Sequence, residues 1–120
     1  MNYYISITGL KPKNFISTFR FWSLAIPCFR LAQKSKGNVF CETKKISGFQ
    51  CTLTAWETKE DMLRFVHSEM HLKAMRAFNS IATGRTYGQE CEAIPNWEKA
   101  FQMLQEKGKE YNKKSNGRGS

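Results

Sequence analysis

Segments with the apolar periodicity of strands and segments with that of helices follow one another along this 120-residue chain. Their order predicts the fold. Four segments alternate with the period of half-buried strands: residues 2–8, 39–46, 49–56 and 85–93. Three segments repeat apolar side chains every three or four positions, as helices do: residues 15–35, 58–82 and 96–107. The order β-α-β-β-α-β with an added C-terminal helix predicts an α+β chain with a ferredoxin-like antiparallel sheet.

Capping signals predict where the helices begin and end. Asn14 is placed to cap the first helix, and Lys36-Gly37-Asn38 to stop it. Pro27 should kink or divide that helix, because proline lacks a backbone donor. Thr58 begins a capping box ahead of the second helical segment, and Ser68 marks a break within it.

Glycine and proline also suggest strand boundaries. Residues 9–12 are expected to end the first strand, and Ser47-Gly48 to form the hairpin turn between the middle strands. Thr83-Gly84 is expected to separate the second helical segment from the fourth strand. Each of these signals depends only on neighbouring residues, so it predicts an element boundary without information on tertiary contacts.

The first helix carries an unusually wide apolar surface. One row consists of Phe15, Phe19, Trp22, Ile26 and Phe29. A second row consists of Phe21, Leu24, Cys28 and Leu31. Both long helices should lie on one face of the sheet, which leaves the other face without a cover. Dimerisation, sheet against sheet, would bury that face, so the sequence predicts a homodimer.

The net charge of +9 suggests an acidic partner, but much of it lies at the C-terminus. From Lys107 onward, five basic residues face Glu110 alone, in a segment without apolar periodicity. We therefore expect one domain over residues 1–107 and a disordered basic tail over residues 108–120. An RNA-recognition fold has the same element order, and Tyr3, Tyr4 and Phe49 are its candidate stacking residues. The third strand lacks the corresponding signature, so specific nucleic-acid binding is the less favoured alternative.

The chain also lacks the marks of secretion and of a membrane span. Its start has no basic segment followed by a long apolar one, and no apolar run reaches the roughly 18 residues that cross a bilayer. The four cysteines (Cys28, Cys41, Cys51 and Cys91) show no metal-binding spacing. We expect reduced, mostly buried thiols in a cytoplasmic protein, with a Cys41–Cys51 disulfide as the minor alternative.

None of the common nucleotide-binding, hydrolase or zinc-protease motifs occurs, so single residues must suggest the chemistry. The two histidines, His67 and His71, stand four apart, which on one helix would direct both imidazoles to the same side. They are candidates for a general base or a haem ligand, and the alternative is a surface pair without a ligand. Trp56, at the end of the third strand, either packs in the core or lines the opening of a cavity.

Other aromatic residues are candidates for the lining of a ligand pocket. Tyr87 should lie on the fourth strand, on the opposite face from Glu90, because strand side chains alternate. The candidate pocket set is completed by residues of the helical segments: Phe19, Trp22, Phe65 and His67. Ordinary core packing is the alternative for each of them.

The residues around Trp56 and His71 match a known pattern. A strand ending Leu53-Thr54-Ala55-Trp56-Glu57-Thr58 is followed by a helix with Met62 and Phe65, then by Ser68-Glu69-Met70-His71-Leu72-Lys73-Ala74-Met75. Further along, TGRTY leads into IPNWEKA. This pattern resembles the dimeric α/β-barrel superfamily of antibiotic biosynthesis monooxygenase-like proteins. Within it, the chain most resembles the small spheroidene monooxygenase-like (DUF3291-like) members.

The resemblance implies a homodimer with a pocket between sheet and helices, and oxygenation of an aromatic or isoprenoid molecule. It implies either no cofactor or haem, with Trp56 and His71 as catalytic candidates and His71 as the ligand if haem binds. In the haem-degrading branch the ligand histidine corresponds to Met75 and a tryptophan to Phe65, so the resemblance does not extend to haem degradation. Two functions follow: a monooxygenase-like enzyme for a small hydrophobic substrate, or a non-catalytic dimeric module that binds such a molecule.

Overall fold

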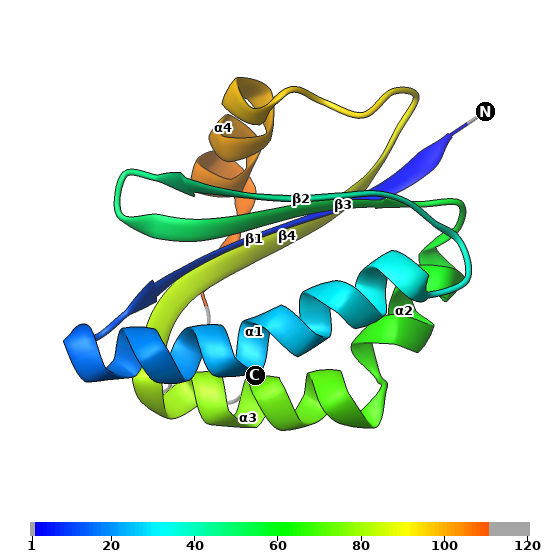
Figure 1. The fold of residues 1–120 in the computed structure, drawn as a ribbon. Coiled ribbons are helices and arrows are strands. Elements are labelled where there is room, and N and C mark those ends of the chain that lie inside the picture. The colour runs from blue at the N-terminus through cyan, green and yellow to red at the C-terminus, as the bar shows by residue number, and fades with distance from the viewer. Residues whose placement is uncertain (1, 111–120) are drawn as a thin grey trace.

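A computed structural model describes residues 2–110, and these form an antiparallel sheet between two helical layers (Figure 1). The elements are β1 (Tyr3–Pro12), α1 (Phe15–Lys34), β2 (Asn38–Ile46), β3 (Phe49–Trp56), α2 (Lys59–Val66), α3 (Glu69–Ile81), β4 (Ala82–Cys91), α4 (Trp97–Lys107) and β5 (Lys109–Glu110). The strand order is β2-β3-β1-β4-β5, so the predicted ferredoxin-like α+β fold is confirmed. Helices α1, α2 and α3 lie on one side of the sheet and α4 on the other (Figure 1).

The prediction of an uncovered sheet face is wrong, because α4 packs on that face. Ala100, Met103 and Leu104 of α4 are buried against Ile5 and Leu53 of the central strands. Tyr3 and Phe49 also pack on this side, against the core cluster and against Phe101 respectively. The surface that an RNA-recognition fold uses for stacking is therefore occupied by a helix of the same chain.

Two glycines that were expected to end elements lie inside paired strands instead. β1 continues through Gly9 to Pro12 and pairs with β4 over its whole length. A Cβ at Gly9 would stand 2.9 Å from Leu104 Cδ2, so glycine allows α4 to approach the sheet. A Cβ at Gly84 would collide with the Gly9 carbonyl oxygen, so glycine allows the close approach of β4 to β1 at this position. β4 begins at Ala82, directly after α3.

The first helix begins as predicted, but a different row of it faces the core. Asn14 Oδ1 accepts a hydrogen bond from the Ser17 backbone at 2.8 Å, and Pro27 lies within α1 without dividing it. Phe21, of the second apolar row, is buried against Leu10 and Phe78. Phe15 and Phe19, of the first row, have exposed fractions of 76% and 67%. The additional apolar row at the start of α1 therefore lies at the surface.

The middle hairpin forms as predicted, because its turn residues supply the required backbone. Ser47 and Gly48 both have positive φ angles, 52° and 84°, which is the conformation of a tight hairpin turn. After the hairpin, Thr58 Oγ1 accepts a hydrogen bond from the Asp61 backbone and caps α2.

The break at Ser68 places the two histidines on different helices. His67 is the C-cap of α2, whereas Ser68 caps α3 by accepting a hydrogen bond from the His71 backbone at 3.3 Å. The prediction that both imidazoles project from one helical face is therefore wrong. The change of direction carries the His67 side chain to the surface and places His71 in the first turn of α3.

The C-terminal boundary lies beyond the predicted one. Lys109 pairs with Thr86 and Glu110 with Arg85, which forms the short strand β5 at the edge of the sheet. These two residues belonged to the predicted tail. The rest of that tail, residues 111–120, lies outside the described residues.

Candidate functional site

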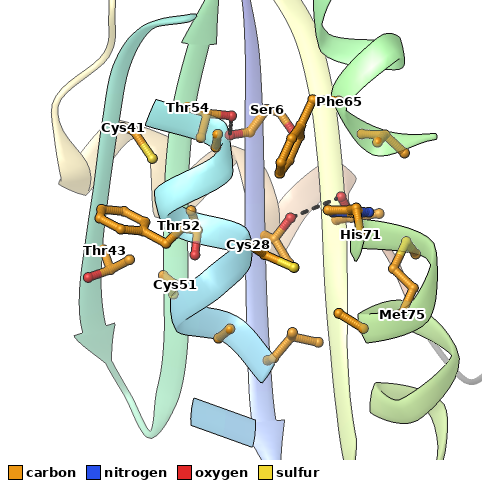
Figure 2. A pocket seen from close by; sticks show the side chains of 18 of the residues that line it. Ser6, Cys28, Cys41, Thr43, Cys51, Thr52, Thr54, Phe65, His71 and Met75 are labelled. Atoms are coloured by element: carbon orange, nitrogen blue, oxygen red, sulfur yellow. Dashed lines mark hydrogen bonds between the residues drawn. The ribbon is translucent and has the colours of Figure 1, made fainter. Parts of the chain in front are cut away.

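A cavity of about 700 Å³ lies between the sheet and the helices α1, α2 and α3. Its floor is made of strand side chains that point to this face, and most of them carry a hydroxyl group. They come from β1, β2, β3 and β4: Ser6, Thr8, Thr43, Thr52, Thr54 and Thr86. Figure 2 shows several of these hydroxyl groups on the strands beneath α1. The floor therefore offers hydrogen bonds to hydroxyl or carbonyl groups of a ligand.

The walls and roof of the cavity are apolar and come from the helices. They include Phe21, Trp22, Ala25, Ile26, Phe29 and Ala32 of α1. From α2 and α3 they include Met62, Leu63, Phe65, Val66, Ala74, Met75 and Phe78. An apolar enclosure with few polar groups on one side is typical of a site for a small organic molecule.

Trp56 forms one end of the cavity and is fully buried. Its indole Nε1 donates a hydrogen bond to Thr54 Oγ1 at 2.9 Å. That hydroxyl in turn donates to the Ser6 carbonyl oxygen at 3.5 Å. Since its one polar atom already has a partner in the protein, Trp56 supplies shape and aromatic surface to the cavity.

Phe65 stands between Trp56 and His71 and contacts both rings. The Trp56 and Phe65 rings are stacked, with centroids 5.4 Å apart and an interplanar angle of 26°. The His71 imidazole meets Phe65 at an interplanar angle of 67°, with centroids 4.8 Å apart. The three side chains, here called the aromatic row, connect the end of β3 to the start of α3 along one wall of the cavity.

His71 is the titratable group of the aromatic row, and its surroundings favour the neutral form. Burial lowers the pKa of His71 below its usual 6.5, and the charge of His67 lowers it further, whereas the Val66 backbone raises it in part. Nδ1 of His71 is buried and has no hydrogen-bond partner among the described residues. An imidazole that is neutral at pH 7 can accept a proton, so His71 is chemically suited to act as a base.

The predicted pocket residues divide into those at the cavity and those away from it. Trp22 and Phe65 line it. Phe19 and His67 do not, because their side chains lie on the outer surface of α1 and at the C-cap of α2. Tyr87 also borders the cavity, although it lies opposite Ile7 and packs against the core on the α4 side of the sheet.

Tyr4 is a cavity residue that the sequence interpretation assigned only to RNA stacking. Its ring lies over Gly88, where a Cβ would stand 2.5 Å from the Tyr4 hydroxyl oxygen. Burial raises the pKa of Tyr4 above 10.0, helped by Tyr87 and Glu90. The alternation of side chains along the first strand could have predicted this place for Tyr4, because Tyr4, Ser6 and Thr8 share the face opposite Ile5 and Ile7.

The four cysteines are free thiols, as expected. Cys41 and Cys51 cannot form the alternative disulfide, because their partners Thr54 and Lys44 place them on opposite faces of the hairpin. Burial raises the pKa of Cys41 to about 12 and that of Cys51 to about 11. Thiols with such values are protonated at neutral pH and are poor nucleophiles and metal ligands.

The described residues offer no multi-ligand metal site at His71, since residues 2–110 contain no group of three or more histidine, cysteine or acidic side chains that could hold a metal ion. A histidine that ligates a single metal centre, such as a haem, is commonly held by a hydrogen bond from its other ring nitrogen. The Val66 backbone supplies a hydrogen bond to the His71 ring, and Nδ1 has no partner among residues 2–110, so haem ligation by His71 stays a prediction. In the same part of the chain, no helix is long and apolar enough to cross a membrane.

No protein-family model and no curated protein sequence matches the chain, but solved structures share its fold. A candidate antibiotic biosynthesis monooxygenase from Deinococcus radiodurans superposes with a TM-score of 0.67 at 12% identity, over 78% of this chain and 96% of that one. SnoaB, a cofactor-independent oxygenase from Streptomyces nogalater, gives 0.63 at 10% identity, over 81% and 98%. A dimeric ferredoxin-like protein of unknown function from Jannaschia sp. CCS1 gives 0.62 at 12% identity, over 76% and 99%. The chain thus has the ferredoxin-like fold of the antibiotic biosynthesis monooxygenase-like proteins.

Proposed function

We propose that this protein is a cofactor-independent monooxygenase that acts on an aromatic molecule bound in the cavity between the sheet and α1, α2 and α3. The observation that carries the proposal is His71, a half-buried imidazole at an apolar cavity with its Nδ1 buried and its pKa lowered. A neutral base at a cavity with apolar and aromatic walls suits proton abstraction from a substrate carbon that an adjoining aromatic system makes acidic. The fold shared with SnoaB, itself described as a cofactor-independent oxygenase, supports this reaction class.

The reaction balances without an external reductant. His71 takes a proton from an activated CH₂ group, and the resulting carbanion passes electrons to O₂. One oxygen atom stays on carbon and the other leaves as water, so that R₂CH₂ and O₂ give R₂C=O and H₂O. The substrate supplies all four electrons, and the proton held by His71 leaves with the water. An isoprenoid without an acidified C–H group does not support this step, which favours the aromatic class of substrate.

The rest of the cavity would orient the substrate for that step. The aromatic row offers flat surfaces for a ring system, because Trp56 and Phe65 are stacked. The hydroxyl groups of the floor, Ser6 and Thr8 among them, offer hydrogen bonds to substrate oxygens. In this role Trp56 positions the substrate, and His71 is the residue that touches the reacting atoms.

A non-catalytic module that binds the same kind of molecule is the second candidate. One observation favours it: among the described residues, those that line the cavity include no aspartate or glutamate that could orient His71 or hold its proton. In many enzymes a buried base is oriented by a third group. Turnover separates the two functions, because a binding module leaves its ligand unchanged.

We also propose that the protein acts as a homodimer, although α4 covers the face that first suggested it. The dimeric ferredoxin-like neighbour supports the proposal. The apolar start of α1, with Phe15, Ile16 and Phe19 exposed, is a surface that a second copy could bury. Light scattering should give twice the chain mass of 13.9 kDa at micromolar concentration. A monomeric mass would refute this proposal without affecting the cavity.

Anthrone, a three-ring molecule with one activated CH₂ group, is the probe that tests the oxygenase. Wild-type protein should consume one O₂ for each anthraquinone formed, above the rate in buffer alone. His71→Asn should lower kcat about a hundredfold or more, as loss of a general base does. His67→Asn is the matched control, because it removes the exposed histidine and should retain the rate. Binding of anthrone without oxygen uptake above the buffer rate would establish the binding module instead.

A further inference from the structure

The charges that border the cavity are all of one sign. Lys107 and Lys109 line it, and no acidic side chain of residues 2–110 does. Burial lowers the pKa of His71 and favours its neutral form, so Lys107 and Lys109 are the charged residues among those that line the cavity. A cavity that is otherwise apolar and hydroxylated thus has a positive region, which favours an anionic group of a ligand.

These lysines border the cavity at the opposite side from Trp56. Lys109 lies on β5 and pairs with Thr86 of β4, which is itself a floor residue. Between β3, which carries Trp56, and β5 the sheet has two further strands, β1 and β4. At the usual strand spacing the two sides are about 14 Å apart across the sheet. A ligand that reaches both sides is therefore elongated, with its charge at one end.

The neighbouring acidic residue does not neutralise the lysines. The carboxylate of Glu110 lies 3.6 Å from the Arg85 guanidinium, and Arg85 also donates a hydrogen bond to the Gln105 carbonyl oxygen at 2.6 Å. Neither Lys107 nor Lys109 forms an ion pair with another side chain of residues 2–110. Their positive charge is available to a ligand.

We propose that the molecule bound in this cavity is an amphipathic anion, with an aromatic body against Trp56 and Phe65 and a carboxylate or phenolate held by Lys107 and Lys109. This inference rests on the proposed function, because it names the substrate class of the same site. The short strand β5 gains a role in it, since its pairing with β4 brings Lys109 to the edge of the cavity floor. An uncharged polycycle would fill the apolar side and make no charge interaction with these exposed lysines.

A matched pair of fluorescent probes tests the proposal on the full chain. Anthracene-2-carboxylate and anthracene-2-carboxamide have the same ring system and differ in charge. Wild-type protein should bind the carboxylate about tenfold more tightly at low salt, and added salt should reduce the difference. Lys107→Gln with Lys109→Gln should remove the preference and leave the affinity for the amide unchanged.

Two further sets of variants serve as controls for the charge and for the place of binding. Lys73→Gln with Lys99→Gln removes the same net charge from residues that do not border the cavity and should retain the preference. Phe65→Ala should weaken both probes, which locates them in the cavity. Equal affinity for the two probes, both weakened by Phe65→Ala, would overturn the anionic ligand and leave the proposed function standing. Loss of the preference in the Lys73/Lys99 control would also overturn it, because bulk charge would then be the cause. Binding that is insensitive to Phe65→Ala, or absent for both probes, would overturn the proposed function as well.

Discussion

The His71 imidazole meets the Phe65 ring with centroids 4.8 Å apart and an interplanar angle of 67°. This contact brings a residue of the first turn of α3 against a residue near the end of α2, across the break at Ser68. It also joins His71 to Trp56 through the stacked ring of Phe65. The position of the proposed base therefore depends on aromatic packing together with its hydrogen bond to the Val66 backbone, while its Nδ1 has no partner among residues 2–110.

Phe65→Leu should loosen this arrangement while it keeps an apolar side chain of similar size. Two ring contacts are lost, so the free energy of unfolding should fall by about 1–2 kcal/mol. Denaturant unfolding measures the change, and anthrone oxidation should fall with it. Phe101→Leu is the control, because it alters an aromatic contact on the α4 face. It should affect stability but not the rate, and an equal loss of rate in both variants would contradict the account.

Thr54→Val should destabilise the protein more than its small change in volume suggests. Valine cannot accept the hydrogen bond from Trp56 Nε1, which would leave a fully buried donor without a partner. The expected cost is about 1–3 kcal/mol, measured by denaturant unfolding. Thr52→Val, on the same strand face but without a bond to an indole, should cost much less. An equal loss of unfolding free energy in the two variants would show that the hydrogen bond from Trp56 contributes no additional stability.

His71 should titrate below 6.5 in the folded protein, because burial disfavours its charged form. Between that lowered pKa and 6.5 the unfolded chain binds more protons than the folded one. Stability is therefore complete above pH 6.5, falls as the pH drops through this window, and levels off below the folded pKa. NMR titration of the imidazole gives the pKa, and denaturant unfolding of wild type against His71→Asn isolates the effect. A pKa at or above 6.5 would contradict the buried, neutral imidazole.

The cysteine thiols should react slowly while the protein is folded. Burial raises the pKa of Cys41 to about 12 and that of Cys51 to about 11, so little thiolate is present at pH 8. With an aromatic disulfide reagent, these two should be slow in native protein, and all four should react at once in denaturant. Site-specific labelling followed by mass spectrometry would record the order. Rapid modification of Cys41 in the native protein would show that its side of the cavity opens to water.

Local signals in the sequence predicted much of the fold. Asn14 and Thr58 cap helices because each side chain accepts a hydrogen bond from a backbone N–H of the first turn. Ser47 and Gly48 make the hairpin turn through their positive φ angles. Each of these interactions spans only a few residues, so the sequence carries the full information for them.

The sequence-based predictions were wrong where contacts between segments far apart in the sequence determine the structure. Gly9 ends no strand, because its missing side chain makes room for Leu104, almost a hundred positions later. The role of α4 was missed for the same reason, since an apolar stripe does not reveal which face of a sheet it covers. Phe19 belongs to an apolar row as regular as that of Phe21, yet only the latter reaches Phe78 of α3.

The candidate site was predictable in part. Trp56 and His71 were selected together, and the structure brings both to one cavity. Phe65, which connects them, was selected as a pocket residue without that role. The hydroxylated floor was missed because it comes from four strands. Lys109 was missed because it lies in the segment assigned to the tail, and Lys107 because it was only the last residue of the predicted C-terminal helix.

The pH dependence of kcat/KM for anthrone oxidation tests the central claim most directly, that neutral His71 takes the substrate proton. The account predicts a constant value above the pKa of His71 and a tenfold fall for each pH unit below it. The apparent pKa of this profile should equal the pKa that NMR gives for the His71 imidazole in the free protein. A profile that is flat through that pKa, or one that His71→Asn leaves unchanged, would contradict the assignment of His71 as the base.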